Sequence, residues 1–417
     1  MTVAPSLNDT RQVRWRGALW TTVLSGVQAL VASLAQLVLF GAAARALSAE
    51  EFGIWTALAT LGIWLTLSDF GINKAIMTEW AGSSTRPGLV STGFFLQAAV
   101  AWSLAAVVYL LTDATNGIVR FALLPLLTVA PFAVARSILS GRQRGWVPAV
   151  WDLSGSSLVL ILALTVAPSA GLVGLAIIAV SGICLSRFLG FLWLTNTARP
   201  SLRSIDIEQA KSLWRSGRHF LVAQLADLLM LQGLPWVAIL ILGPARSGPF
   251  SSAVRLVSFL PVVAMLFCNG LIPAYADATA RGDDAWITKT LRNTAVSAGV
   301  AAAGSALILA ITLSGLLKVW LGSITPMPTA ALLWLTLWAS VQCLVTPILA
   351  FLYGTGQAAP AARWNLFSAL AGLAVGVGLA QHWGPTGLAA GLCAGSLLLC
   401  LLPLAMRSIA LTRAYPV

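Results

Sequence analysis

Long apolar stretches follow one another along almost the whole chain, and only short polar segments separate them. A helix needs about 20 apolar residues to cross the hydrocarbon core of a bilayer. Only 9% of the residues are charged, whereas a soluble domain carries about 25%. A soluble fold of this size has too little interior to bury so much apolar surface. The sequence therefore predicts an all-α polytopic membrane protein.

Stretches of sufficient length predict about twelve transmembrane helices. Their ranges are 17–44, 52–76, 88–111, 117–139, 146–167, 171–196, 217–242, 250–276, 287–316, 327–353, 361–381 and 385–406. The longest polar segment, 197–216, is typical of a cytosolic helix lying in the membrane interface, with Leu202, Ile205, Leu213 and Trp214 toward lipid. The predicted parts are an N-terminal six-helix bundle at 1–196, this linker helix at 197–216, and a C-terminal six-helix bundle at 217–417.

The lysines and arginines indicate how the predicted spans are oriented. Most of the 25 basic residues fall in alternate loops, on the side that also holds the N-terminus. The positive-inside rule places this side, and with it both termini, in the cytoplasm. The net charge of +12 is dispersed among these loops and is not gathered on one soluble face. We therefore expect contact with membrane lipids and no binding to nucleic acid.

The sequence lacks the short motifs of several enzyme and metal-binding classes. It has no GxxxxGK[ST] phosphate loop, no HExxH motif and no nucleophile elbow. The five cysteines lie in apolar stretches without a CxxC pair, so neither a disulfide framework nor a metal site is expected. These observations favour a transporter over an enzyme.

Two loops of similar sequence indicate an internal duplication. The stretch LSAEEFGIWTA begins at Leu47 and matches LGPARSGPFSSA, which begins at Leu242. The matched pairs are Leu47 with Leu242, Gly53 with Gly248, and Trp55 with Phe250. Each stretch follows the first span of a six-span half, and Gln28 and Gln224 lie at corresponding places in those spans. Because six is even, both halves start on the same side, which predicts a parallel repeat of two pseudo-symmetric six-helix bundles.

The motifs in two regions resemble those of a known transporter family. LSAEEFGIW, from Leu47, followed by LTLSDFGINKA, from Leu65, is similar to the first two spans of the polysaccharide (O-antigen type) flippases of the multidrug/oligosaccharidyl-lipid/polysaccharide exporter superfamily. That family often has a Leu-x-x-x-x-Tyr/Phe-Gly loop and then Asp-Leu/Phe-Gly near the end of the second span. FSSAVRLVSFLPVVAMLFCNGLIPAYA, from Phe250, resembles the eighth span of the superfamily, including its lipid II flippases. The chain departs from the usual pattern at Pro249, where a small or aliphatic residue is commoner.

The resemblance implies a flippase for a lipid-linked glycan. Such a protein moves an oligosaccharide on undecaprenyl diphosphate from the cytosolic to the outer leaflet of the bacterial inner membrane, for surface polysaccharides such as O-antigen or exopolysaccharide. The implied mechanism is alternating access, in which a central cavity between the two bundles opens to each side in turn. The implied partners are the lipid-linked oligosaccharide, membrane lipids, and the glycan polymerase and export machinery. No cofactor is implied, and coupling to a proton or sodium gradient stays open.

Two other functions stay open. A MATE-like antiporter for multidrug or organic-cation substrates belongs to the same superfamily, and it would need an acidic cavity. A membrane-embedded glycan polymerase, ligase or acyltransferase would be expected to have a large outer loop or a catalytic His/Asp motif. The deep charges are two arginines and one aspartate, and the predicted outer loops are short. These features favour the flippase.

Three arginines in or near the spans are candidates for binding the diphosphate, because guanidinium groups match phosphate oxygens. Arg255 lies about five residues, roughly 8 Å, into the eighth span, and the resemblance to lipid II flippases places it in the cavity; structural pairing or extension to the outer headgroups is the alternative. Arg187 lies deeper, in the sixth span, and either faces the cavity or pairs with Asp227. Arg136, near the cytosolic end of the fourth span, is a substrate contact or an inside-positive anchor.

Four glutamines are candidates for contacts to sugar. Gln28, Gln97, Gln224 and Gln342 fall within predicted spans, where they either bind sugar hydroxyls or form interhelical hydrogen bonds. Asp227 lies one helical turn from Gln224 on the same face. An acid at that depth is costly, and it either couples transport to protons or sodium or neutralises a nearby arginine.

A short polar group ends the second predicted span. Asp69, Asn73 and Lys74 lie toward its cytosolic end, and Gly71 between them permits close packing or a bend. This position is typical of a gate more than of a mid-membrane binding site. The sequence predicts that these residues form a hinge and latch by pairing with neighbouring helices.

Overall fold

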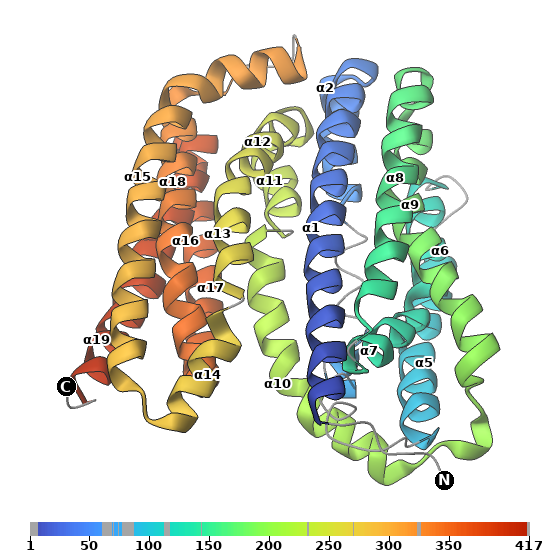
Figure 1. Ribbon diagram of the computed structural model, residues 1–417. Helices are drawn as coiled ribbons and strands as arrows, with labels where there is room; N and C mark the ends of the chain where they lie inside the picture. The colour runs from blue at the N-terminus through green and yellow to red at the C-terminus, as the bar shows by residue number, and fades with distance from the viewer. Residues whose placement is uncertain are drawn as a thin grey trace, which may run out of the picture. The chain divides into compact units, whose positions relative to one another are not determined.

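Helices make up the regular secondary structure in the described part of the chain (Figure 1). The computed structural model describes residues 7–60, 69, 71–73, 75–76, 87–111, 117–142, 144–231, 233–269, 271–322 and 327–414. No β-strand occurs among these residues. The predicted all-α class is confirmed.

Ten helical segments of the described chain are long and apolar enough to cross a membrane. They are Val23–Ala46, Gly88–Val107, Leu123–Gly141, Trp146–Thr165, Leu172–Ala198, Pro244–Met265, Asp284–Leu321, Thr329–Gly354, Ala359–Trp383 and Pro385–Thr412. Each corresponds to a predicted span. In the second predicted span, 52–76, residues 61–68, 70 and 74 lie outside the described part of the chain. The seventh, 217–242, is divided between α10 (Ile207–Leu231) and α11 (Leu234–Leu242).

The chain packs into two compact units. The first unit, Met1–Ser48 with Leu58–Leu221, contains α1 (Leu7–Ala46), α5 (Pro87–Leu111), α6 (Gly117–Val129), α7 (Ala133–Gly141), α8 (Trp146–Thr165), α9 (Leu172–Trp193) and the start of α10. The second unit, Ala49–Ala57 with Val222–Val417, contains α2 (Ala49–Leu58), α11, α12 (Pro244–Val257), α13 (Phe259–Asn269), α14 (Leu271–Arg281), α15 (Asp284–Leu321), α16 (Thr329–Gly354), α17 (Ala358–Trp383), α18 (Pro385–Gly395) and α19 (Leu402–Ala414). The division falls inside α10, near the predicted start of the C-terminal bundle at 217.

The predicted interfacial helix at 197–216 does not form as a separate helix. Arg199 takes a left-handed conformation with φ 41°, and α10 begins only at Ile207 and continues to Leu231. Hydroxyl groups of α5 hold the turn before α10: Ser204 Oγ donates to Ser91 Oγ at 2.7 Å. Leu213 is fully buried in the first unit's core, not directed to lipid as predicted. The polar composition of this segment therefore reflects a turn and the first turns of a packed helix.

The other three residues predicted to face lipid have exposed side chains. Leu202, Ile205 and Trp214 are 68%, 40% and 49% exposed. They occupy the turn and the outer face of α10.

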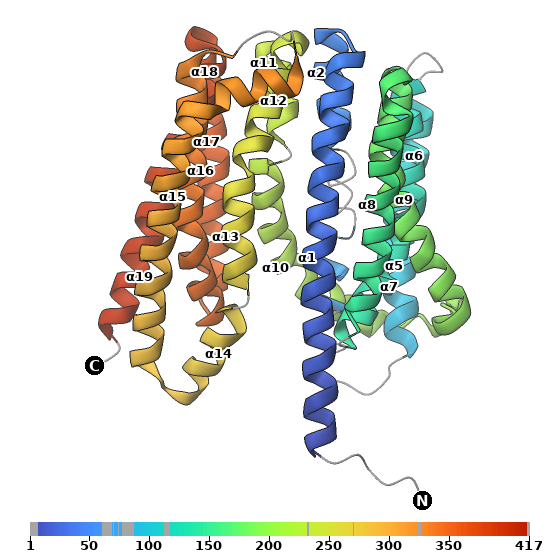
Figure 2. The same ribbon diagram turned by 45° about the horizontal axis from the view of Figure 1, so that its top comes forward.

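Close helix packing in the first unit depends on glycines. α1 and α8 run side by side in both views (Figures 1 and 2), and α8 also packs on α9. A Cβ atom added to Gly155 of α8 would lie 2.2 Å from the carbonyl oxygen of Gly182 of α9. A Cβ atom on Gly182 would lie 2.7 Å from the carbonyl oxygen of Gly155. Small residues allow membrane helices to approach this closely.

The second unit repeats this device in its last two spans. A Cβ atom added to Gly391 of α18 would lie 2.2 Å from the Cα atom of Gly376 of α17. Ser368 Oγ donates a hydrogen bond to the carbonyl oxygen of Gly395 at 2.9 Å. The fifth and sixth spans of each half thus pack through glycine backbones, as expected of an internal repeat.

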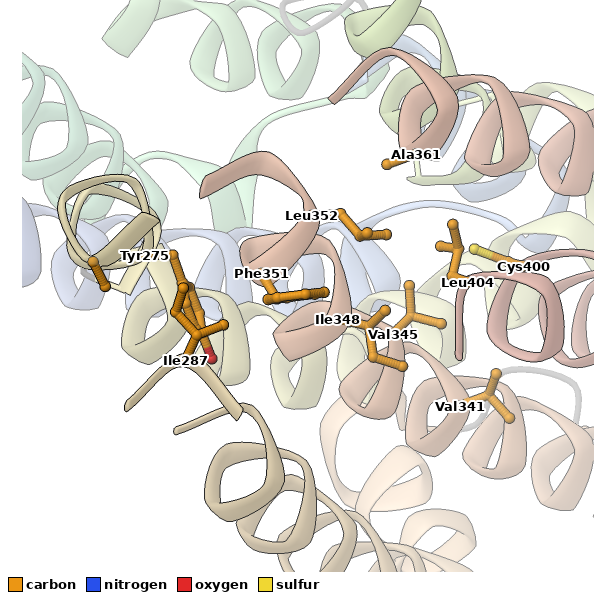
Figure 3. Close-up of a cluster of buried hydrophobic side chains, with 11 residues drawn as sticks. Tyr275, Ile287, Val341, Val345, Ile348, Phe351, Leu352, Ala361, Cys400 and Leu404 are labelled. Atoms are coloured by element: carbon orange, nitrogen blue, oxygen red, sulfur yellow. The ribbon is translucent and has the colours of Figure 1, made fainter. Parts of the chain in front are cut away.

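The main apolar cluster of the second unit surrounds α16 (Figure 3). The ring of Tyr275 on α14 meets the rings of Trp286 and Phe351 edge to face, with centroids 5.7 and 5.6 Å apart. Ile287 of α15 and Leu404 of α19 are fully buried in the same cluster. α14, α15, α16 and α19 are therefore joined by one continuous set of buried side chains.

The start of α2 packs on the start of α12 inside the second unit. A Cβ atom added to Gly53 would lie 1.8 Å from the carbonyl oxygen of Pro244. A Cβ atom added to Gly248 would lie 2.5 Å from Cδ1 of Phe52. Gly53 and Gly248 are matched positions of the predicted repeat, so the two equivalent loops contact each other. Phe52 and Trp55 are completely buried at this contact.

We expect Gly53→Ala to lower the stability of the second unit strongly. The new methyl group meets a backbone carbonyl that cannot rotate away, and such overpacking costs about 3 kcal/mol. Thermal unfolding of the purified protein in detergent measures the effect. Gly304→Ala on α15 is the matched control, since an added Cβ there has nothing within 4 Å and alanine favours a helix by about 1 kcal/mol. Equal unfolding temperatures for the two variants would contradict the close contact.

Candidate functional site

Eight polar and charged side chains of the first unit, which we call the polar cluster, form two hydrogen-bonded groups and a set of interacting charges. It comes from the broken second span, α5, α7, α8 and α9, and its members are Asp69, Asn73, Gln97, Arg136, Ser137, Asp152, Ser186 and Arg187. Five of these residues are sequence-predicted site residues, and Ser137, Asp152 and Ser186 are not. The apolar residues around it include Val134, Ile138 and Leu213, all fully buried.

The strongest charge pair of the polar cluster joins α7 to α8. Arg136 Nη1 lies 2.5 Å from Asp152 Oδ2, with the arginine side chain 51% exposed and the aspartate side chain 17% exposed. Ser186 Oγ of α9 donates to the other carboxylate oxygen, Oδ1, at 2.6 Å. Both oxygens of Asp152 are therefore engaged. Arg136 therefore forms an ion pair in addition to the two roles predicted for it, substrate contact or inside-positive anchor.

Asp152 is not among the predicted site residues, although its position in an apolar segment could have indicated it. It lies only six positions after Trp146, the start of α8, in a segment long and apolar enough to cross a membrane. An ionisable residue in such a segment is a site candidate by default.

Arg187 interacts electrostatically with both aspartates of the polar cluster. The charges of Arg136, Asp152 and Asp69 all act on its guanidinium group. Within the described part of the chain it forms no hydrogen bond and no ion pair within 4 Å. Its side chain is partly exposed. The acids near Arg187 are thus Asp152 and Asp69. Asp227 is the partner that the sequence predicted as an alternative, and its side chain lies outside the described residues.

Asp69 and Gly71 form a turn within the predicted second span. The amide of Gly71 donates to Asp69 Oδ1 at 2.8 Å, which is the short side-chain turn that aspartate favours. Gly71 has φ +75°, and a Cβ atom there would lie 2.2 Å from the carbonyl oxygen of Gly217 on α10. Only glycine satisfies both the left-handed backbone and this contact. The prediction that Gly71 permits close packing or a bend is confirmed.

Asn73 joins the interrupted span to two neighbouring helices. Its Oδ1 atom accepts hydrogen bonds from Gln97 Nε2 of α5 at 2.8 Å and from Ser137 Oγ of α7 at 3.0 Å. Gln97 is buried and makes an interhelical hydrogen bond, which is the second of its two predicted roles. Lys74, predicted beside them, lies outside the described residues.

The remaining glutamine candidates are dispersed. Gln28 Nε2 of α1 lies 3.4 Å from Ser156 Oγ of α8, a long interhelical contact. Gln342 is half-buried on α16 of the second unit, and its side-chain amide forms no hydrogen bond to a residue that the structure describes. Gln224 lies on α10, with its side chain outside the described part.

Arg255 lies in the second unit and deeper along its helix than predicted. Because α12 begins at Pro244, eleven residues before it, Arg255 is about 16 Å from the helix start at 1.5 Å per residue. Within the predicted eighth span, 250–276, α12 ends at Val257 and α13 follows from Phe259. Arg255 thus occupies the last turn of α12, where a cation is favoured by the carbonyl groups of the helix end. It is half-buried.

No group of three or more histidine, cysteine, aspartate or glutamate side chains suited to a metal ion occurs in the described ranges. The five cysteines are unpaired with one another. The chemistry of the polar cluster is therefore that of guanidinium, carboxylate, amide and hydroxyl groups.

We expect Asn73→Ala to destabilise the first unit by about 1–3 kcal/mol, because two interhelical donors lose their acceptor. Gln28→Ala is the matched control: it removes a single long contact and is expected to cost less than about 1 kcal/mol. Denaturant or thermal unfolding in detergent gives both values. Comparable losses in the two variants would show that Asn73 does not join these helices.

A family model described as polysaccharide biosynthesis protein matches residues 15–279. No sequence among the curated proteins matches this chain.

Several solved structures share the fold. The lipid II flippase MurJ in an inward closed conformation aligns with a TM-score of 0.73 and 11% identity, over 93% of this chain and 87% of that chain. An inward-facing multidrug resistance MATE family transporter of the MOP superfamily gives 0.67 and 17% identity, over 93% and 99% of the two chains. A mutant of the Vibrio cholerae MATE transporter VcmN gives 0.64 and 15% identity, over 97% of both.

At these identities the structural likeness shows the fold alone, which is that of membrane transporters with helical bundles. The family model covers well over half of the chain. Its match and the arrangement of spans agree with the resemblance found in the loop and second-span motifs. The chain is a multi-pass membrane protein that belongs to the polysaccharide biosynthesis protein family, with the fold of the MOP-superfamily transporters.

Proposed function

We propose that this protein is a flippase for a lipid-linked oligosaccharide. It moves a glycan on undecaprenyl diphosphate from the cytosolic to the outer leaflet by alternating access, for surface polysaccharides such as O-antigen or exopolysaccharide. The family supports the pathway, and the fold shared with MurJ and MATE transporters supports transport rather than enzymatic catalysis. The basic loops support a location in the bacterial inner membrane with both termini in the cytoplasm.

The single observation that carries the proposal is the state of Arg187. A guanidinium group has five N–H donors, and Arg187 uses none of them on the described residues. A charged group in an apolar segment without a close partner is expensive, so its retention calls for an anion that arrives from outside. A diphosphate fits, because its oxygens accept paired, charge-assisted hydrogen bonds from arginine.

The way charges are paired in the polar cluster favours an anionic over a cationic substrate. Asp152 is paired with Arg136 and bonded by Ser186, so an organic cation would have to displace Arg136 to reach this carboxylate. Asp69 uses Oδ1 on the backbone of Gly71. The MATE-like function shares the fold, and this electrostatic difference is what argues against it.

The other candidate residues have separate proposed roles. Arg255 in the second unit is proposed as a further phosphate contact, and Gln342 and Gln224 as contacts to sugar. Asp69 and Asn73, with Lys74, are proposed to form the cytosolic latch, because their bonds join the interrupted span to α5 and α7. Asp227 is proposed for coupling to a proton or sodium gradient. The glycan polymerase and export machinery are the proposed downstream partners.

Proteoliposomes test this function directly. The purified protein is reconstituted with undecaprenyl diphosphate carrying a fluorescent oligosaccharide, and a membrane-impermeant quencher reports how fast the glycan changes leaflet. We expect Arg187→Ala to lower the rate by about 10–100-fold, because it removes hydrogen bonds to a charged group. Arg187→Lys is expected to restore part of the rate, since it keeps the charge and loses the planar fork.

The controls separate charge at this site from charge in general. Arg203→Ala removes an exposed arginine of the same unit and is expected to leave the rate unchanged. A fluorescent organic cation, offered to the same vesicles under a proton or sodium gradient, tests the antiporter alternative. Transport of this cation without movement of the glycolipid would refute the proposed function, and a wild-type rate for Arg187→Ala would refute the role of the arginine.

A further inference from the structure

Two arginines and one shared carboxylate stand together in the polar cluster. Arg136 and Arg187 lie near enough for their charges to repel each other, and Asp152 attracts both. Only Arg136 is in contact with the carboxylate, at 2.5 Å. A single carboxylate therefore compensates one of two neighbouring cations at close range. A diphosphate group carries two phosphates and can match two guanidinium groups at once.

The exposed fractions of Arg136 and Asp152 also indicate that Arg136 can bind an incoming anion. The side chain of Arg136 is 51% exposed, while that of Asp152 is only 17% exposed. The carboxylate is thus fixed inside the packed helices, and the arginine is the partner that can turn toward an incoming anion. An ion pair with one half-exposed member adds little to stability, so exchanging the partner of Arg136 costs little free energy.

Ser186 lowers the cost of leaving Asp152 alone. Its hydroxyl donates to Oδ1, the oxygen that Arg136 does not use. This bond remains when Arg136 departs, and the nearby charge of Arg187 still acts on the carboxylate. A buried carboxylate without any donor would be strongly destabilising.

We propose that Asp152 competes with the substrate's diphosphate for Arg136. In the empty protein Asp152 holds Arg136; when the diphosphate binds at Arg187, Arg136 turns to it; when the substrate leaves, Asp152 takes Arg136 back. This inference rests on the proposed function. The competition keeps affinity low enough for release, since a site that moves its ligand must bind it and also let it go. Asp152 is thus an affinity-setting residue that acts through Arg136.

Binding of inorganic pyrophosphate to the purified full-length protein tests the exchange. Isothermal titration calorimetry in detergent gives Kd for the wild type and for Asp152→Asn, which is isosteric and still accepts from Ser186. We expect the variant to bind pyrophosphate about 3–5-fold more tightly, because Arg136 is no longer held. In proteoliposomes the same variant is expected to flip the glycolipid more slowly, because release is delayed.

A double-mutant cycle separates exchange from simple removal of a negative charge. Exchange requires Arg136, so Asp152→Asn in an Arg136→Ala background is expected to change Kd much less than it does when Arg136 is present. Long-range electrostatics alone would tighten binding equally in both backgrounds, and that result would overturn the proposal. A lower unfolding temperature for Asp152→Asn, with the same or weaker pyrophosphate binding, would likewise show a purely structural ion pair.

Two further variants complete the test. Ser186→Ala keeps every charge and removes the donor that supports the lone carboxylate, so pyrophosphate binding is expected to weaken about 2–3-fold; unchanged binding would count against the exchange, whether or not Asp152→Asn folds. Glu208→Gln removes an exposed negative charge of the same unit and is expected to have no effect.

The failure of this inference can be told apart from failure of the proposed function. If Arg187→Ala weakens pyrophosphate binding and Asp152→Asn does not strengthen it, only the exchange falls. If the wild type and Arg187→Ala bind pyrophosphate equally, or neither binds it, the anion site itself is absent and both proposals fall.

Discussion

The hydrocarbon core of a bilayer offers polar groups no hydrogen-bond partner, so a membrane-spanning chain must supply partners itself. Helices satisfy the backbone, and in the polar cluster several side chains satisfy one another. One amide oxygen of Asn73 serves two donors from different helices. One carboxylate, Asp152, serves a guanidinium on one oxygen and a hydroxyl on the other. The polar cluster is a consequence of this constraint, and Arg187 stands out because it does not share in it.

Close backbone approach is the second requirement, and glycines provide it at matched places. Gly155 with Gly182 joins α8 to α9, and Gly376 with Gly391 joins α17 to α18. Without water to drive association, membrane helices gain stability from tight contact between backbones. Gly71 combines this role with a left-handed turn, so that the break in the second span and its packing on α10 depend on the same residue.

The proposed function depends on how few charges the polar cluster contains. Two arginines and two aspartates occupy the first unit's site, and the short contacts link Arg136 with Asp152 and Asp69 with its own turn. The arrangement leaves one cation with unused donors in an apolar surrounding. This pairing is the reason that we propose a phosphate-bearing substrate over an organic cation.

Much of the candidate site was visible in the sequence, because a polar residue stands out in an apolar stretch. Asp69, Asn73, Gln97, Arg136 and Arg187 were all singled out on this ground. Their pairing was not visible, since partners come from helices far apart in the chain. Asp152 was overlooked, and Arg187 was assigned a different acid as its alternative partner. The same limit explains Leu213, whose basic neighbours suggested an interfacial helix although α5 and the second span bury it.

The sequence by itself determined that this chain crosses a membrane many times, that it repeats a six-span unit, and that it belongs with the flippase family. Segment length, apolar content and local motifs carry that information, because each is a property of consecutive residues. Only the tertiary structure decided which polar groups meet and which cation remains available. Those outcomes depend on distances of a few ångströms between helices, and side-chain partnership at that range is set by packing, not by position along the chain.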